Sequence, residues 1–191
     1  MSKLTLKSDE TVAYQGRMLE IVNQEMTDGN KTIVFERARR APGVRLILID
    51  SQNKTVLLSK EHRYELGKDD YRLPGGKVFD TLTEYNSFLK SGEDILVPAK
   101  QKALAEAEEE VGVAADDAVH FHTSVCGATV QWDLFYFVCT SWKSTEQKLE
   151  IGENIQIVTV SFDEAQHIAL NGAMSEERSA LVLLRYLSSV A

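Results

Sequence analysis

The sequence has few prolines and cysteines and lacks any long apolar or basic run. Three prolines among 191 residues, 43% of which are apolar, exclude collagen-like, low-complexity and wholly disordered chains. The longest apolar run, Leu134–Cys139, has six residues, whereas a membrane-spanning helix needs about twenty. We therefore expect a compact soluble chain with one main domain, with or without a small appendage, and no membrane segment.

Charge and cysteine usage limit the partners and the compartment. The chain has 21 basic and 29 acidic residues, a net charge of −8, and no basic stretch long enough to follow a duplex. This balance argues against a nucleic-acid partner. The first residues lack a secretion signal, and Cys126 and Cys139 match no metal-binding spacing. A reducing, cytoplasmic compartment is therefore expected.

Alternating residues and turn signals predict strands in both halves of the chain. A first hairpin is expected from residues 18–26 and 32–35, on either side of the turn at 28–30. A more apolar hairpin follows at 44–49 and 55–58, which suits the centre of a sheet. Further strands are expected at residues 121–125, 134–140 and 155–160.

The strongest helix signal covers residues 98–111. Pro98 suits a first helical turn, and Gly112 suits the position just past a helix end. Residues 65–70 are expected to form a charged loop, and residues 79–97 an insertion with a short helix at 85–89. Two helices are predicted near the end, one from Phe162 to about 171 and one from a cap at 175–177 to residue 186 or 187. This order indicates a mixed α/β sandwich.

Three acids in the main predicted helix have the spacing i, i+3, i+4. Glu106, Glu109 and Glu110 would project from one side, where their like charges repel one another. A divalent cation would reverse that repulsion, and oxygen ligands suit Mg²⁺ or Mn²⁺ rather than Zn²⁺. A solvated acidic helix face is the alternative reading of the same spacing. A second stripe is predicted to face a core: Ala103, Ala107 and Val111.

Together with a glycine loop, this helix resembles the signature of the Nudix hydrolase superfamily. The loop is Leu-Pro-Gly-Gly-Lys-Val at 73–78, and the second half of the signature is Ala-Glu-Ala-Glu-Glu-Glu-Val-Gly-Val at 105–113. The resemblance implies the Nudix α/β/α sandwich with a mixed central sheet, preceded by a small antiparallel N-terminal β-hairpin or sheet. It also implies metal ligands at Glu106, Glu109 and Glu110.

The chain departs from the Nudix signature at two places. Between Gly76 and Glu106 lie 29 residues where the family has 14, so that 15 are extra, and Ala105 replaces the signature arginine. The first glutamate of the signature is best assigned to Glu93. Asp80 and Glu84 are the alternatives.

Within the superfamily, the chain is most similar to the ADP-ribose pyrophosphatase branch. The similarity lies in Lys-Glu-His-Arg at 60–63 and in the segment 152–165. It implies hydrolysis of a nucleoside diphosphate sugar such as ADP-ribose to a nucleoside monophosphate and a sugar phosphate. It further implies a homodimer, with residues 1–41 as a dimerisation or substrate-clamping β region and 42–191 as the Nudix domain.

The branch resemblance also implies roles for individual residues. The Gly75 carbonyl and Glu153 would join the three helix acids as metal ligands, and the catalytic residues would be Glu153, Glu150 and Glu109, with Glu153 or Glu150 as general base. Arg63 would grip a phosphate. Three arginines could bind phosphate or clamp a dimer, or instead lie on a solvated strand face: Arg37, Arg39 and Arg40. Arg72 stands where the branch usually has an acid.

Two other functions remain open at this point. Ala105 and the insertion are compatible with a Nudix-fold module that binds a nucleotide sugar with little or no hydrolysis. A hydrolase of another nucleoside diphosphate derivative is also compatible with the motifs. Retention of the three helix acids favours the enzyme.

Overall fold

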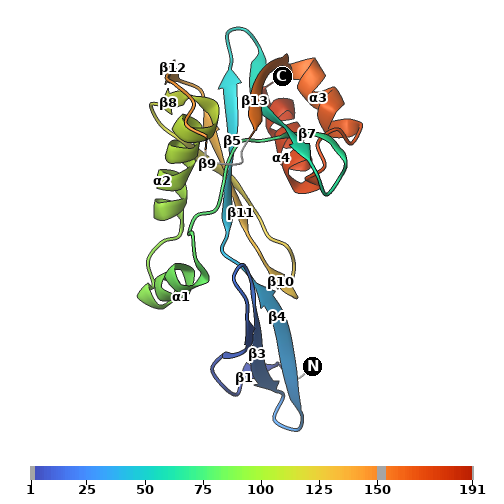
Figure 1. Ribbon diagram of the computed structural model, residues 1–191. Helices are drawn as coiled ribbons and strands as arrows, with labels where there is room; N and C mark the ends of the chain where they lie inside the picture. Colours follow the sequence, from blue (N-terminus) through green and yellow to red (C-terminus); the bar gives the residue numbers. More distant parts are fainter. Residues whose placement is uncertain (1–2, 150–153, 191) are drawn as a thin grey trace. The chain divides into compact units, whose positions relative to one another are not determined.

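The computed structural model describes residues 3–149 and 154–190 (Figure 1). Its contacts divide the described chain into two compact units. The first unit falls within Met1–Pro42, Lys77–Asp94 and Val125–Asp133. The second falls within Gly43–Gly76, Ile95–Ser124 and Leu134–Ala191. Most of the predicted insertion at 79–97 thus clusters with the N-terminal β region.

The first unit is built on a five-stranded sheet and one helix. Its strands are β1 (Thr5–Leu6), β2 (Thr11–Gln15), β3 (Glu20–Thr27), β4 (Thr32–Arg39) and β10 (Val130–Gln131). Strands β3 and β4 pair from Glu20↔Arg39 to Thr27↔Thr32, which confirms the predicted hairpin. The structure adds β1 and β2 as antiparallel neighbours of β3, and β10 runs parallel to β4.

Helix α1 (Leu82–Ser91) confirms the expected short helix and extends it in both directions. Its start is a capping box, in which Thr81 Oγ1 accepts from the Glu84 N–H and the Glu84 carboxylate accepts from the Thr81 N–H. Its end is Gly92 in the left-handed conformation, with φ of 73°. The Thr-x-x-Glu pattern at 81–84 is typical of a capping box and could have predicted the start of α1.

The second unit contains a six-stranded mixed sheet. Its order is β13-β6-β5-β11-β9, and β7 pairs with β6 on the edge opposite to β13. The strands are β5 (Gly43–Asp50), β6 (Thr55–Arg63), β7 (Lys68–Arg72), β9 (Val119–Ser124), β11 (Leu134–Cys139) and β13 (Ile155–Ser161). Strands β5 and β11 run parallel, and the other pairs are antiparallel. A separate two-stranded sheet joins β8 (Val113–Ala115) and β12 (Trp142–Ser144).

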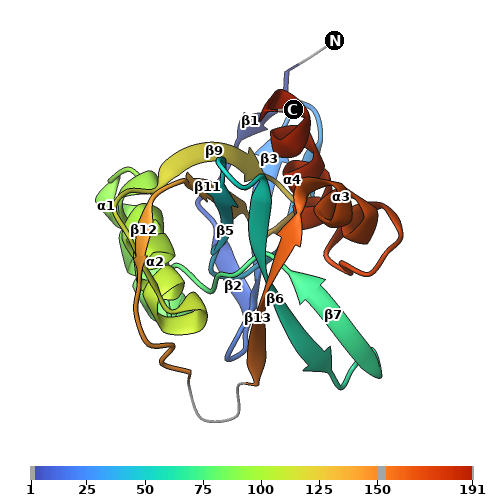
Figure 2. The same ribbon diagram turned by 90° about the horizontal axis from the view of Figure 1, so that it is seen from above.

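Helices cover both faces of this sheet. Helix α2 (Leu96–Glu106) lies on one face, and α3 (Phe162–Leu170) and α4 (Glu177–Val190) lie on the other (Figure 2). Strand side chains alternate between the faces, so the buried Leu46 and Leu48 lie opposite to Arg45. The second unit is therefore an α/β/α sandwich, as the sequence predicts.

The charged segment after Arg63 differs from the prediction. Residues 65–70 were expected to form a loop. Residues 65–67 do lie in a turn, but Lys68–Arg72 form strand β7, paired with β6. Cross-strand charge pairs stabilise it: the Asp69 carboxylate contacts Lys60 Nζ at 3.1 Å and His62 Nδ1 at 3.1 Å. The high charge of this segment reflects salt-bridged strand side chains rather than irregular backbone.

The predicted helix at 98–111 has two parts. After α2 the backbone forms a π-turn at Ala107–Val111, in which the Gly112 N–H bonds the carbonyls of Ala107 and Glu108. Ala103, Ala107 and Val111 are buried, as expected. The wider π-turn changes the directions of the acids around the helix axis from those of a regular α-helix.

Candidate functional site

The glycine loop lies along the start of β5, in the second unit. The Val44 N–H donates to the Gly76 carbonyl at 2.9 Å, and the Leu46 N–H donates to the Pro74 carbonyl at 2.8 Å. Gly75 has φ of 143°, and a Cβ there would overlap the Val44 carbonyl. Only glycine fits this position without moving the strand.

Two of the predicted metal ligands contact this loop. The Gly75 N–H donates to Glu110 Oε2 at 2.8 Å. A Cβ on Gly76 would overlap the carboxylate of Glu106, which is itself buried. Both glycines therefore allow the helix carboxylates to reach the loop backbone.

Lys102 brings positive charge to the same carboxylates. Its Nζ lies 3.1 Å from Glu106 Oε1 and 3.6 Å from Glu109 Oε2. Glu106 lies one helical turn after Lys102 and Glu109 about two turns after it, so a long side chain can reach both. Two of the three helix acids predicted to bind metal thus share one ammonium group.

The helix carboxylates are the candidate ligands of the metal that the resemblance implies. Across residues 3–149 and 154–190, no three His, Cys, Asp or Glu side chains are placed so that they could hold a metal ion together. Glu106 and Glu109 meet Lys102, whereas Glu110 contacts Gly75. The chemistry still suits a hard divalent cation, because the donors are carboxylates and two of them already share a positive group.

Glu150 and Glu153 lie outside the described residues. The chain just before them is bonded to the π-turn: the Lys148 N–H donates to the Glu109 carbonyl at 2.8 Å, and Gln147 Nε2 donates to the Glu110 carbonyl at 2.6 Å. Gln147 Nε2 also donates to the Ile155 carbonyl at 3.1 Å. These bonds bring residues 147 and 148 to the acidic end of the helix.

Arg63 lies at the end of β6 and is engaged by two carboxylates. Its Nε donates to Glu65 at 2.7 Å, its Nη2 also contacts Glu65, and its Nη1 lies 3.2 Å from Glu61. Partial burial opposes its charge, but these hydrogen bonds outweigh that effect and raise the pKa of Arg63. A phosphate reaching Arg63 would replace the exposed Glu65.

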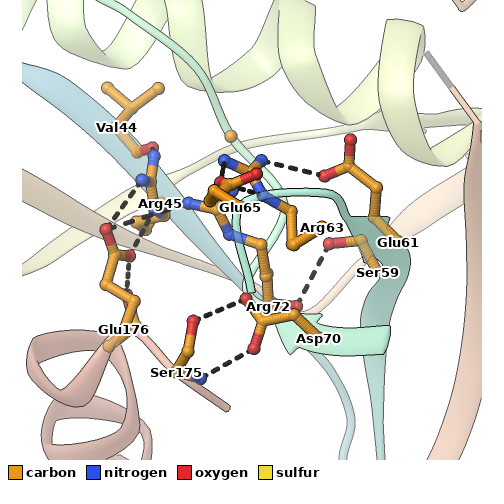
Figure 3. A network of polar contacts seen from close by, with 12 residues as sticks. Val44, Arg45, Ser59, Glu61, Arg63, Glu65, Asp70, Arg72, Ser175 and Glu176 are labelled. Atoms are coloured by element: carbon orange, nitrogen blue, oxygen red, sulfur yellow. Dashed lines mark hydrogen bonds and ion pairs between the residues drawn. The ribbon is translucent and has the colours of Figure 1, made fainter. Parts of the chain in front are cut away.

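Near Arg63, Arg45 forms a buried ion pair that sequence reasoning did not predict (Figure 3). Arg45 Nε and Nη2 donate to the two Glu176 carboxylate oxygens at 2.8 and 3.0 Å. Burial would raise the pKa of Glu176, but the hydrogen bonds and charge of Arg45, with smaller contributions from Ser179 and Arg72, lower it to about 2. The position of Arg45 within the apolar run of β5 was the one sequence feature that could have indicated a buried ion pair.

Arg72 is half-buried beside this pair. Its Nη2 lies 3.9 Å from Glu176 Oε1, whose carboxylate already binds Arg45. Burial and then the charge of Arg45 lower the pKa of Arg72. The neighbouring Asp70 accepts from the Ser175 N–H and hydroxyl, both at 2.7 Å, which holds β7 to the start of α4 (Figure 3).

A polar hollow of about 180 Å³ opens on strands β6, β7 and β13. Its walls are polar, which suits a hydrated ligand group or water rather than an apolar ring. The lining residues are Lys60, Glu61, His62, Asp69, Asn154 and Gln156.

The other predicted phosphate-binding arginines belong to the first unit and contact groups of that unit. Arg37 and Arg39 both contact Glu10, and Arg39 Nη1 also pairs with the buried Glu20 at 3.3 Å. The Arg40 guanidinium lies 4.4 Å from the centre of the Trp132 ring. These contacts stabilise the first sheet and β10, and they give no separate indication of a ligand.

The three candidates for the first signature glutamate also belong to the first unit. Glu84 completes the capping box of α1, and its carboxylate accepts from the Asp80 N–H at 3.1 Å. Glu93 is exposed, and its N–H donates to Ser91 Oγ at 3.2 Å. Local helix and turn contacts therefore account for the positions of all three.

Comparison with solved structures identifies the fold. A crystal structure of an ADP compounds hydrolase matches this chain with a TM-score of 0.68 and 16% identity, covering 98% of this chain and 92% of that chain. The fold is Nudix-like. This confirms the expected α/β/α sandwich with its N-terminal sheet, whereas identity this low shows the fold alone.

Two other comparisons found nothing similar: no family model matches the chain, and neither does any curated protein. Among the helices of the described chain, none is long and apolar enough to cross a membrane.

Proposed function

We propose that this protein is a divalent-metal-dependent Nudix hydrolase of nucleoside diphosphate derivatives, with nucleoside diphosphate sugars such as ADP-ribose as its substrates. The observation that carries the proposal is the contact of Glu106 and Glu110 with the Gly75–Gly76 loop. The name of the structural neighbour, an ADP compounds hydrolase, supports the same class of substrate.

The residues that would hold Mg²⁺ or Mn²⁺ are Glu106, Glu109 and Glu110, with the Gly75 carbonyl and Glu153. When bound, the metal would neutralise the diphosphate charge and lower the pKa of a bound water. The π-turn carries Glu109 and Glu110, and the Gly75 N–H donates to Glu110. Arg45 interacts electrostatically with one of them, Glu110.

In the proposed reaction, Glu153 or Glu150 takes a proton from water as the water oxygen attacks one phosphorus. The bond from that phosphorus to the bridging oxygen breaks, and the products are a nucleoside monophosphate and a sugar phosphate. Arg63 would bind a phosphate oxygen pair in exchange for Glu65. Arg72 offers a second guanidinium on the same side of β6 and β7.

Phosphate release from a panel of compounds tests this proposal. The panel is ADP-ribose, other nucleotide sugars, dinucleoside polyphosphates and nucleoside triphosphates, each with Mg²⁺ and with a chelator. We expect turnover of nucleoside diphosphate sugars that chelation abolishes. Glu109→Gln and Glu110→Gln should each reduce kcat by about 100-fold or more.

Glu108→Gln is the matched control within the same helix turn. Glu108 pairs with Lys148 at 2.9 Å on the surface, and such a pair contributes little, so this variant should keep wild-type activity. Tight binding of nucleotide sugars without turnover would contradict the enzyme proposal and indicate a binding module. Turnover of dinucleoside polyphosphates or nucleoside triphosphates instead of nucleotide sugars would show that the proposed substrate class is wrong.

We also propose that the protein is a homodimer joined through its N-terminal sheet. Several large apolar side chains of this sheet are between 39% and 65% exposed: Leu6, Val12, Tyr14, Ile33, Val34 and Phe35. A small sheet with such exposure gains stability when a second surface covers it. For the compartment we propose the reducing cytoplasm, in agreement with the two free cysteines.

A further inference from the structure

The ammonium group of Lys102 lies between two carboxylates that the proposed reaction needs for metal. Lys102 Nζ is 3.1 Å from Glu106 and 3.6 Å from Glu109. The side chain of Glu106 is 10% exposed and that of Lys102 is 29% exposed. This ion pair is screened less by water and salt than a pair on the open surface.

The positive charge of Lys102 opposes two unfavourable effects at these carboxylates. Glu106 and Glu109 carry like charges on one helix side, and Glu106 is buried against Gly76. Without a positive partner, their repulsion and the desolvation of Glu106 would both oppose folding. Lys102, one turn before Glu106, supplies a positive charge that offsets both effects.

We propose that Lys102 is an internal counter-ion that holds the metal-binding carboxylates together before metal arrives and must leave them when metal binds. The proposal rests on the proposed function, because Glu106 and Glu109 are its metal ligands. Lys102 is thus a positioning residue that lowers the affinity of the site for a divalent cation. The length and flexibility of the lysine side chain allow the ammonium to withdraw towards solvent.

Competition between Lys102 and a metal ion for the carboxylates predicts the direction in which metal affinity changes when Lys102 is replaced. A metal that must displace the ammonium of Lys102 binds with a lower apparent affinity, because only molecules whose carboxylates are free of the ammonium can bind it. A retained positive charge near the ion weakens binding further. Removing the charge should therefore tighten metal binding, whereas removing a residue that only supports the site would weaken it.

The test is titration of the full-length protein with Mn²⁺ alone, followed by calorimetry and by the electron paramagnetic resonance of free Mn²⁺. We expect Lys102→Met to bind Mn²⁺ about tenfold more tightly than the wild type, and Lys102→Arg to bind like the wild type or more weakly. Lys100→Met is the matched control, because Lys100 lies on the same helix but pairs with Asp117 at 2.6 Å, whereas Lys102 pairs with Glu106 and Glu109. It should leave Mn²⁺ affinity unchanged.

Thermal unfolding gives a second readout that does not depend on activity. In a chelator, Lys102→Met should have a lower Tm than the wild type, because the carboxylates have lost the positive charge of Lys102. With saturating Mn²⁺ the difference should disappear, so that the metal-induced rise in Tm is larger in the variant. A variant that is destabilised equally with and without Mn²⁺ would contradict the proposal.

Glu109→Gln separates this inference from the function on which it rests. If the wild type binds Mn²⁺, Glu109→Gln loses that binding and Lys102→Met binds no more tightly than the wild type, then the role of Lys102 is wrong and the metal site stands. If neither the wild type nor Lys102→Met binds Mn²⁺, both proposals are overturned.

Discussion

Arg45 and Glu176 form a two-pronged ion pair inside the second unit, with N–O distances of 2.8 and 3.0 Å. The two residues are 131 positions apart in the chain, and they join central strand β5 to the start of α4. Arg45 donates additionally to the Val44 carbonyl at 2.8 Å. This pair connects the strand beside the glycine loop to a helix on one face of the sheet.

The first prediction concerns acid stability. The pKa of Glu176 is about 2 in the folded protein against 4.5 as its ordinary value, so this group contributes about 3 kcal/mol of stability at neutral pH. Because the folded pKa is the lower one, the contribution is complete above the unfolded pKa and is lost as pH falls from about 4.5 towards 2. Denaturant unfolding at a series of pH values measures this loss.

Glu176→Gln tests the source of that dependence. It leaves Arg45 buried without its ionic partner and should cost about 3–5 kcal/mol at pH 7. The difference from the wild type should shrink as pH falls below 4.5. The exposed neighbour substitution Glu177→Gln should change stability by less than about 1 kcal/mol, and an equal effect of both substitutions would contradict the assignment.

The second prediction concerns the glycine loop. Gly75→Ala places a Cβ against the Val44 carbonyl, in addition to the strain of a positive φ, and should cost about 2 kcal/mol or more. Gly92→Ala is the control, because Gly92 also has a positive φ, of 73°, but nothing lies within 4 Å of its added Cβ. It should cost about 1 kcal/mol. Equal losses in urea unfolding would show that backbone strain alone matters at Gly75.

The third prediction concerns the two thiols. Cys126 is exposed, whereas Cys139 is buried in β11, and burial raises the pKa of Cys139 to about 12. A thiol-specific reagent at pH 8 should therefore modify one cysteine rapidly in the native protein and both after denaturation. Cys126→Ser should abolish the rapid phase. Fast modification that persists in this variant would mean that β11 opens readily.

The fourth prediction concerns the proposed dimer. Val34 is 55% exposed in the N-terminal sheet, so Val34→Glu should weaken an interface formed there and shift the protein towards monomers. Leu170→Glu is the control, because Leu170 is 73% exposed on α3. Light scattering after gel filtration, at several concentrations, measures the mass. A wild-type protein that is monomeric at every concentration would contradict the proposed dimer.

Local patterns in the sequence predicted most strands and helices of this protein. The hairpin around residues 28–30, the apolar strands β5 and β11 and the stripe of Ala103, Ala107 and Val111 depend on neighbouring residues and on burial. The charged loop expected at residues 65–70 was wrong for residues 68–70, which belong to strand β7. Strand β7 is charged because its side chains pair with those of β6.

The sequence by itself determined the residue types of the candidate site: paired glycines after a proline, and three acids at the end of a helix. Tertiary structure decided how they meet. The π-turn, the contact of Glu110 with Gly75 and the pairing of Arg45 with Glu176 depend on where β5, α2 and α4 pack. Such contacts join residues far apart in the chain, and their energies depend on burial, which no local pattern of residues specifies.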